Sequence, residues 1–334
     1  MIIDAHAHLV APPTLYSYRS TLHASRGQHG FFKAAIGDEE LSRFAAQNVA
    51  LMDEVGTDMQ LLSPRPYMLL HGTNRFDDIR AWTEVNNDLI ARTVKLYPKR
   101  FRGVGALPQA AGAPVETLFD EINRCIGELG FVGVLLNPDP GEGAGTTPPL
   151  GDRYWYPLYQ KLVERDIPAH IHSCACCGRE TYDEHFVTEE SLAITSVARS
   201  EVFKHFPTLK LMISHGGGAI PYQVGRWRSH RQMEIKSGRL PKDTETFDAT
   251  LRRFWFDTCL HNRKSLELLF DVVGVARCCF GTERPGSGGG VDPVSGKPYD
   301  DIKPTIEAIA SLGPADRQAI FEGNARQLFS RLAA

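Results

Sequence analysis

The sequence predicts an α/β protein in which residues 1–334 form one (β/α)8 barrel of the TIM type, with long loops after several strands. Short β-rich runs alternate with helical stretches from one end of the chain to the other. Eight such runs can be counted, and this number favours closure of a parallel sheet into a barrel. The alternative is an open doubly wound sheet, but no glycine fingerprint opens a helix after the first run.

The expected elements follow this alternation in order. Strands are expected over 1–6, 58–63, 101–107, 131–137, 167–172, 209–214, 254–259 and 275–280. Helices are expected over 41–55, 77–97, 115–129, 154–165 and 315–332, with further helices after the fifth and sixth strands. Long loops are expected over about 10–38, 139–151 and 284–303, and they mostly follow strands. In a barrel these loops lie on the catalytic face.

Composition and charge exclude several classes of protein. With 42% hydrophobic and 23% charged residues, the chain is ordinary globular material, not disordered, collagenous or coiled-coil. The 37 basic and 40 acidic residues form no stripe or tail that would indicate nucleic acid or an anionic membrane as partner. Apolar runs such as 131–136 fall far short of the roughly 20 residues of a membrane span.

The N-terminus and the cysteines predict a cytoplasmic protein. Asp4, His6 and His8 interrupt the N-terminal stretch where a secretory signal would be apolar. The seven cysteines are an odd number in a chain that is large enough to bury its own core. This count favours a reducing compartment over a disulfide framework.

Two histidines at the end of the first strand are the first candidate metal ligands. His6 and His8 are two residues apart, so on a strand both imidazoles point to the same side. Imidazole is a favoured ligand of zinc in catalytic sites. Two solvated histidines near the N-terminus are the alternative interpretation.

Three further strands are expected to end in side chains of similar chemistry. The fifth ends at His172, the sixth leads into His215, and the eighth leads into Glu283. The C-terminal ends of barrel strands are where the chemistry resides. Histidines together with a carboxylate make a suitable site for zinc or manganese, with room for water or substrate. His170 ranks below His172 as a candidate, and four unrelated residues are the alternative.

Four motifs, in order along the whole chain, resemble the amidohydrolase superfamily and its amidohydrolase-2 branch of decarboxylases, hydratases and related lyases. They are IIDAHAH at 2–8, IH at 171–172, SHGGG at 214–218 and GNARQLF at 323–329. The resemblance implies a divalent metal cofactor, with Zn²⁺ expected first and Mn²⁺ as an alternative. It also implies that His6, His8, His172 and Glu283 are the metal ligands, and that His215 is an acid/base beside them.

Further stretches look like the 4-oxalomesaconate hydratases of that branch: 137–140, 148–157, 280–283, 290–293 and 299–301. Those hydratases carry a glutamate at the end of the eighth strand, as Glu283 does here, where most relatives carry an aspartate. The resemblance implies a metal-dependent lyase that hydrates a conjugated unsaturated oxo-polycarboxylate, 4-oxalomesaconate or a close analogue, from aromatic-ring cleavage. His215 or Glu283 would then move the protons.

Three other functions stay open at this point. The second hypothesis is non-oxidative decarboxylation of an aromatic or muconate-type acid on the same fold. Hydrolysis of a lactone or an amide ranks third. A metal-free binding protein on a barrel scaffold is a different class, and the converging ligand-type side chains argue against it.

A small-molecule carboxylate substrate requires cationic anchors. Arg65, at the end of the second strand, is the first choice because its guanidinium matches a carboxylate in a two-pronged geometry, and a salt bridge on the barrel rim is the alternative. Arg284 is the second choice. Ser287 and Cys174 belong to loops that are expected to contact substrate.

Cys174, Cys176 and Cys177 together are interpreted as thiols that line a pocket, because no second cysteine pair completes a structural zinc site. We also expect a homo-oligomer, as is common for soluble enzymes of this kind.

Overall fold

Eight parallel strands form the centre of the computed structural model, which describes residues 1–25, 34–73, 75–174 and 180–333. The strands are β1 (Ile3–His8), β2 (Met59–Ser63), β3 (Phe101–Ala106), β4 (Gly133–Leu136), β5 (Ala169–Ile171), β6 (Leu211–Ile213), β7 (Trp255–Asp257) and β8 (Cys278–Cys279). They pair in sequence order, each parallel to the next. The predicted (β/α)8 barrel is therefore confirmed.

Backbone hydrogen bonds bring the last strand next to the first. The amide of Ala5 donates to the carbonyl of Phe280 at 2.8 Å, and the amide of Glu283 donates to the carbonyl of His6 at 2.7 Å. These bonds nearly close the barrel. They also place the segment after β8 directly beside the end of β1.

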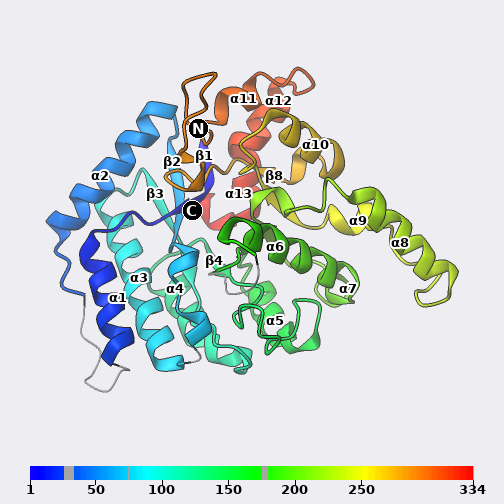
Figure 1. Ribbon diagram of the computed structural model, residues 1–334, viewed down its shortest axis with the longest axis horizontal. Helices are drawn as coiled ribbons and strands as arrows, with labels where there is room; N and C mark the ends of the chain where they lie inside the picture. The colour runs from blue at the N-terminus through cyan, green and yellow to red at the C-terminus, as the bar shows by residue number, and fades with distance from the viewer. Residues whose placement is uncertain (26–33, 74, 175–179, 334) are drawn as a thin grey trace.

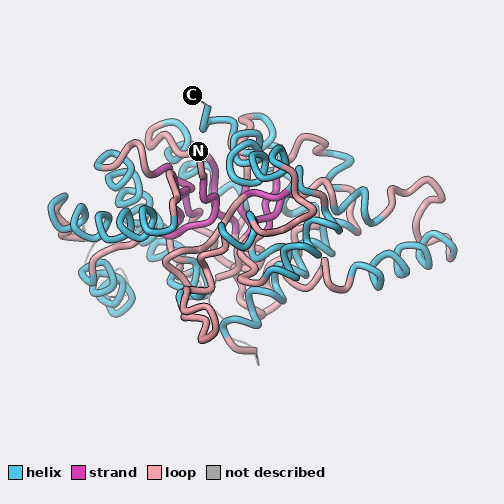
Figure 2. The backbone as a smooth tube through the Cα atoms, turned by 90° about the horizontal axis from the view of Figure 1, so that it is seen from above, coloured by secondary structure: helices cyan, strands magenta, loops and turns pink. Residues whose placement is uncertain are grey.

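Helices surround the strands on the outside (Figures 1 and 2). They are α1 (Pro13–Ser25), α2 (Asp38–Val55), α3 (Phe76–Leu96), α4 (Phe119–Gly127), α5 (Tyr156–Glu164), α6 (Tyr182–Ala198), α7 (Val202–His205), α8 (Val224–Lys236), α9 (Phe247–Leu251), α10 (Arg263–Val273), α11 (Lys303–Glu307), α12 (Pro314–Gln318) and α13 (Asn324–Leu328). None of these helices is long and apolar enough to cross a membrane, as far as the described residues go.

Local sequence signals explain the C-terminus of α2 and the N-termini of α2 and α6. α2 has three acidic residues in its first turn, which suits the positive end of the helix dipole, and it ends at Gly56 with φ 70°. α6 begins with a capping box between Thr181 and Glu184, in which the two residues satisfy each other's backbone amides.

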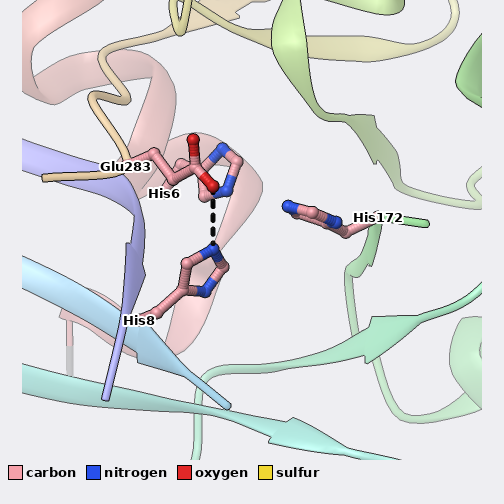
Figure 3. Close-up of side chains that lie close together, drawn as sticks. All are labelled: His6, His8, His172 and Glu283. Atoms are coloured by element: carbon pink, nitrogen blue, oxygen red, sulfur yellow. Dashed lines mark ion pairs between the residues drawn. The ribbon is translucent and has the colours of Figure 1, made fainter. Parts of the chain in front are cut away.

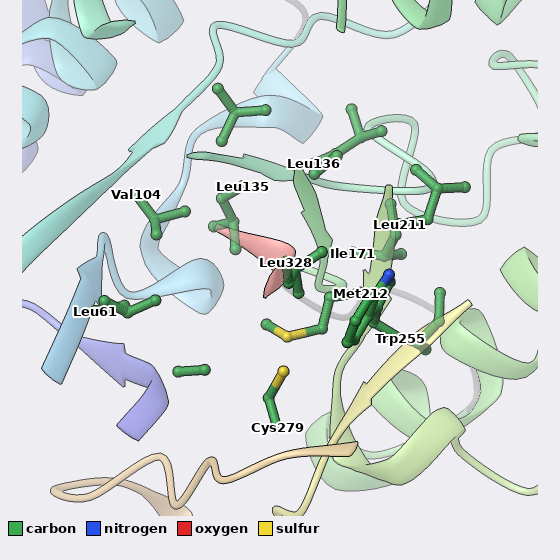
Figure 4. Close-up of a cluster of buried hydrophobic side chains, with 14 of the residues drawn as sticks. Leu61, Val104, Leu135, Leu136, Ile171, Leu211, Met212, Trp255, Cys279 and Leu328 are labelled. Carbon is green, nitrogen blue, oxygen red and sulfur yellow. The ribbon is translucent and has the colours of Figure 1, made fainter. Parts of the chain in front are cut away.

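The interior of the barrel is filled by side chains. Figure 4 shows a buried cluster in which Leu61, Val104, Leu135, Met212 and Cys279 come from five different strands. A packed interior of this kind is usual for the fold, so the barrel is not a pore. Substrate can therefore reach the strands only from their ends.

The structure differs from the expected elements in three places. Helix α1 occupies part of the 10–38 stretch that was expected to be a loop. A 3-10 turn, Val275–Arg277, replaces the start of the expected eighth strand, which leaves only two residues in β8. The expected helix over 315–332 is interrupted between α12 and α13 by the π-helical segment Ala319–Gly323, where the carbonyl of Ile320 accepts a hydrogen bond from the amide of Phe280.

Candidate metal centre

Four side chains from the strand ends converge on one point at the mouth of the barrel. They are His6 and His8 on β1, His172 directly after β5, and Glu283 after β8, and are called the ligand cluster below (Figure 3). Each offers one ligand atom, and these atoms all lie within 4.8 Å of one another. All four side chains are buried, with at most 4% of their surface exposed.

Each imidazole of the cluster is held by a contact to its Nδ1 atom. The partners are Asp257 Oδ2 at 2.6 Å for His6, Ser63 Oγ at 2.9 Å for His8 and the carbonyl oxygen of Ser173 at 2.7 Å for His172. Acceptors at these positions favour a proton on Nδ1, which leaves the lone pair on Nε2. Burial raises the pKa of Asp257, but its hydrogen bond with His6 outweighs this and lowers the pKa to about 2.

The three Nε2 atoms are the strongest sign of a metal site. Those of His6, His8 and His172 are buried and have no hydrogen-bond partner among the described residues. Unpartnered buried nitrogens are costly in a folded protein unless something else satisfies them. With Glu283 Oε1 at 3.5 Å from the Nε2 of His8, the set of three imidazoles and one carboxylate fits a divalent ion such as zinc or manganese.

A second charged pair lies beside the cluster. His215 follows β6, and its Nδ1 contacts Glu190 Oε1 of α6 at 2.9 Å. Its Nε2 lies 3.8 Å from Glu283 Oε2. Burial lowers the pKa of His215, but the carboxylates of Glu190 and Glu283 outweigh it and raise this pKa well above its ordinary value. The two carboxylates therefore favour the protonated form of this ring.

A cavity of about 510 Å³ opens in front of the cluster. Its lining residues are His8, Arg65, Pro66, Tyr67, Phe186, Glu283, Pro285, Gly286 and Ser287. Arg65 donates from Nη2 to the carbonyl of Pro285 at 3.1 Å, and Ser287 donates to Glu283 Oε2 at 2.9 Å. The structure thus places Arg65 and Ser287, both expected substrate contacts, on the wall of this cavity.

The lining of the cavity also includes an aromatic ring. Phe186 of α6 stacks on the ring of His215 at 5.9 Å and meets His172 edge-on at 5.0 Å. The lining thus offers a cation, Arg65, for a negative charge and an aromatic ring, Phe186, for an apolar part of a ligand.

Two of the expected substrate contacts lie elsewhere. The guanidinium of Arg284 is buried in ion pairs with Asp300 at 2.5 Å and Glu54 at 3.3 Å. The backbone turns at Glu283, whose φ of 60° lies in the left-handed region. Glu283 lines the cavity, whereas Arg284 next to it does not. The structure thus places Arg284 in ion pairs outside the lining of this cavity, and its anchor role stays a prediction.

Cys174 is also not among the residues that line the cavity in front of the cluster. Its side chain is 1% exposed, and its Sγ contacts His71 Nδ1 at 3.7 Å. The expected contact of this thiol with substrate stays a prediction. Cys176 and Cys177 lie outside the described residues.

Several residues of the site were not anticipated from the sequence. Asp257 is the end of β7, so the strand-end argument that selected the other candidates applied to it as well. His170 binds Ser214 Oγ at 2.7 Å, which fits its lower rank as a ligand. Glu190 and Phe186 lie inside a helix, where nothing in the local sequence shows that they turn towards His215.

Comparison with known proteins gives a family and similar enzymes. The family model for amidohydrolases matches residues 3–331. The 2-keto-4-carboxy-3-hexenedioate hydratase of Sphingobium sp. is 37% identical over 340 aligned residues, which cover 100% of this chain and 97% of the relative. The crystal structure of 4-oxalomesaconate hydratase from Rhodopseudomonas palustris matches with a TM-score of 0.89 and 36% identity, over 100% of this chain and 97% of the other.

A more distant solved structure shares the fold. The dihydroxybenzoic acid decarboxylase of Polaromonas sp., solved with bound manganese, matches with a TM-score of 0.71 and 22% identity. The match covers 100% of this chain and 98% of the decarboxylase.

Proposed function

The chain belongs to the amidohydrolase family, and on this premise we propose that it is a metal-dependent hydratase. It would add water across a carbon–carbon double bond conjugated to a carbonyl, in an unsaturated oxo-polycarboxylate such as 4-oxalomesaconate. The observation that carries the proposal is the ligand cluster, with its three unpartnered Nε2 atoms, beside the His215–Glu190 pair. Likeness over the full chain to two hydratases supports the substrate class.

The proposed cofactor is a divalent metal held by His6, His8, His172 and Glu283. Zinc suits three imidazoles and a carboxylate best, and manganese, bound in the distant decarboxylase, is the alternative. When bound, such an ion lowers the pKa of a coordinated water or polarises a substrate oxygen. Asp257 orients the imidazole of His6, as partners of metal-binding histidines commonly do.

The protein's own groups supply the proton transfers in this proposal. Hydration requires one group that removes a proton from water and another that delivers a proton to carbon. Burial raises the pKa of Glu283, but the neighbouring imidazoles of His215 and His8 outweigh it and lower this pKa well below its ordinary value, so Glu283 is the ionised group in this proposal. His215 carries the proton that faces this carboxylate, and Glu190 stabilises the imidazolium. A well-placed acid/base of this kind contributes about 10²–10⁴-fold to the rate.

The walls of the cavity supply binding and orientation. Arg65 is already held by the carbonyl of Pro285, so its guanidinium is positioned to bind a substrate carboxylate before substrate arrives. Phe186, which also lines the cavity, packs against the unsaturated carbon chain and excludes water from the face of His215. This lining suits a planar, conjugated acid.

The test is an assay with 4-oxalomesaconate and metal-loaded protein, in which ultraviolet absorbance and released carbon dioxide are followed together. We expect loss of the conjugated absorbance without carbon dioxide. Release of carbon dioxide would instead favour the decarboxylase hypothesis, which the fold shared with the Polaromonas enzyme keeps relevant. If neither signal changed, this substrate would be excluded.

A further inference from the structure

Two more side chains with metal-binding atoms lie beside Glu283. Both come from the loop that follows β7, which brings them to the same end of the barrel as the ligand cluster. They are Cys259 and His261, two residues apart. His261 has φ 50°, in the left-handed region, so the backbone turns at this residue. A non-glycine residue in this conformation is uncommon and points to a position that the surrounding structure imposes.

The three side chains form a triangle of the right size for a metal ion. Cys259 Sγ lies 3.7 Å from His261 Nε2 and 3.8 Å from Glu283 Oε2, and all three ligand atoms are within 4.8 Å of one another. Zinc bonds of 2.0–2.3 Å imply roughly 3.3–3.8 Å between neighbouring ligands of a tetrahedron. A small adjustment of one side chain therefore completes a tetrahedral face, with a fourth position for water.

The surroundings hold this triangle in place. Cys259 is 3% exposed, and Glu283 is buried as well. His261 packs against Gly288, where an added Cβ would lie only 2.4 Å from the Cε1 of the imidazole. The contacts around the Sγ atom are no shorter than 3.7 Å, and thiols are weak hydrogen-bond donors, so these contacts alone contribute little stability.

We infer that Cys259, His261 and Glu283 form a second divalent-cation site that shares the Glu283 carboxylate with the first. The two oxygens of this carboxylate face different ways: Oε1 lies 3.5 Å from the Nε2 of His8, and Oε2 faces Cys259. A thiolate ligand selects Zn²⁺, Cd²⁺ or Co²⁺ and disfavours Mg²⁺ or Ca²⁺. On binding, the sulfur–hydrogen bond is replaced by a sulfur–metal bond, and the proton leaves to solvent.

Occupation of this second site has a consequence for the reaction. The same Oε2 that faces Cys259 also lies 3.8 Å from His215 Nε2 and accepts a hydrogen bond from Ser287. A cation there withdraws the carboxylate from proton transfer, so excess zinc or cadmium inhibits turnover whereas excess magnesium does not. The inhibition rests on the proposed function, but the binding of the cation does not.

Titration of the metal-free protein with Co²⁺ tests the site directly, since a cobalt–thiolate bond gives a charge-transfer band in the near ultraviolet. We expect no such band with the first equivalent, which fills the ligand cluster, and a band that grows with the second. Cys259→Ser should abolish the band and leave one equivalent bound. The matched control is Cys125→Ser, a buried thiol of α4 that contacts Glu121 and should leave both equivalents in place.

Three outcomes would overturn the inference. They are binding of a single equivalent without a band, a band that is complete at the first equivalent, and a band that persists in Cys259→Ser. If Cys259→Ser does not fold, His261→Ala provides the same test, because it also removes one ligand and should lose the second equivalent. None of these readouts involves turnover, so a failed hydratase assay would leave the result of the cobalt titration unaffected.

Discussion

At the scale of single residues, the two ring nitrogens of His172 have different surroundings. The imidazole of His172 is fixed through Nδ1 by a carbonyl, and its Nε2 has no partner among the described residues. Replacing the ring would break no hydrogen bond of Nε2 to the described residues. It would remove the atom that is proposed to bind the metal. The unpartnered Nε2 of His172 therefore supports its proposed role as a metal ligand.

We predict that His172→Ala loses the bound metal and the activity together. The remaining ligands bind the ion too weakly to keep it through purification, as is typical when one of four ligands is lost. Metal analysis of the purified variant measures this. His205→Ala, an exposed histidine of α7, is the control and should keep its metal. Stoichiometric metal in His172→Ala would show that this residue is not a ligand.

His215→Asn should separate proton transfer from metal binding. The variant keeps a polar side chain next to Glu190 but cannot become a cation that donates a proton. We predict normal metal content and a kcat lower by about 10²–10⁴-fold. Steady-state kinetics on the metal-loaded variant decide this. Near-normal turnover would remove His215 from the mechanism.

Arg65→Met should act mainly on substrate binding. A charge-assisted hydrogen bond contributes about 1.5–3 kcal/mol, so its loss raises KM by about 10- to 100-fold. Methionine keeps much of the volume on the cavity wall but removes the positive charge. The control is Arg226→Met, an exposed arginine of α8, which should leave KM unchanged. An unaltered KM in Arg65→Met would assign the anchor to another residue.

The sequence anticipated these residues to different degrees. The spacing of His6 and His8 places both imidazoles on one side of a strand, and strand ends meet at one end of a barrel. The spacing is a property of the local sequence, and the meeting of strand ends follows from the predicted barrel. The four residues of the ligand cluster could therefore be proposed from the sequence alone. Arg284 shows the limit of this reasoning, since adjacent residues on an irregular loop need not point the same way.

At the scale of elements, the turn that follows β6 packs against helix α6, which precedes β6 in the chain. His215, Gly216, Gly217 and Gly218 all have positive φ, between 48° and 84°. At Gly218 an added Cβ would lie 2.4 Å from the carbonyl oxygen of Val187 in α6. This close approach keeps α6 near the barrel, and α6 carries both Glu190 and Phe186. The helix thereby positions Glu190 beside His215.

Gly218→Ala should therefore destabilise the protein and impair catalysis. The strained φ of 62° costs about 1–3 kcal/mol, and the clash with α6 displaces Glu190 from His215. Chemical denaturation measures the first effect and kcat the second. Gly225→Ala in α8 is the matched control, because an added Cβ meets nothing within 4 Å, and it should be neutral or slightly stabilising. Wild-type stability in Gly218→Ala would contradict this account.

The order of elements could be predicted because each strand is a short β-rich run followed by a helical stretch. The residues at which helices and strands begin and end could not be predicted, because they depend on tertiary contacts. The break between α12 and α13 depends on a hydrogen bond from Phe280 to a carbonyl some 40 residues later in the chain, at Ile320. The side chain of Asn324 also binds the carbonyls of Val275 and Cys278, which ties the C-terminal helices to β8. No local pattern reveals such contacts.

At the scale of the whole molecule, the proposed metal links segments from both ends of the chain. His6 and His8 lie near the N-terminus, His172 near the middle and Glu283 in the last quarter. An ion bound to all four stabilises the folded state but has no equivalent site in the unfolded chain. Metal binding and the closure of the barrel are therefore coupled.

Removal of the metal should lower the melting temperature. Ligand linkage gives about 2.7 kcal/mol of stabilisation when the free metal is at 100 times its Kd. Thermal unfolding of chelator-treated protein, with and without added Zn²⁺ or Mn²⁺, measures the difference. An identical Tm in both states would contradict a metal bound at the ligand cluster.

The single-domain organisation, the cytoplasmic location and the homo-oligomer stay predictions. Light scattering tests the homo-oligomer.

The most direct test of the central claim is the mass of the product formed from 4-oxalomesaconate in water enriched in oxygen-18. For a metal-dependent hydratase, the metal-loaded protein should yield a product heavier by one labelled water than substrate kept in the same water without the protein, a control that accounts for exchange of the keto oxygen. The metal-free protein should yield none until metal is restored. A product that has lost carbon dioxide, or the same labelled product without any metal, would contradict the claim.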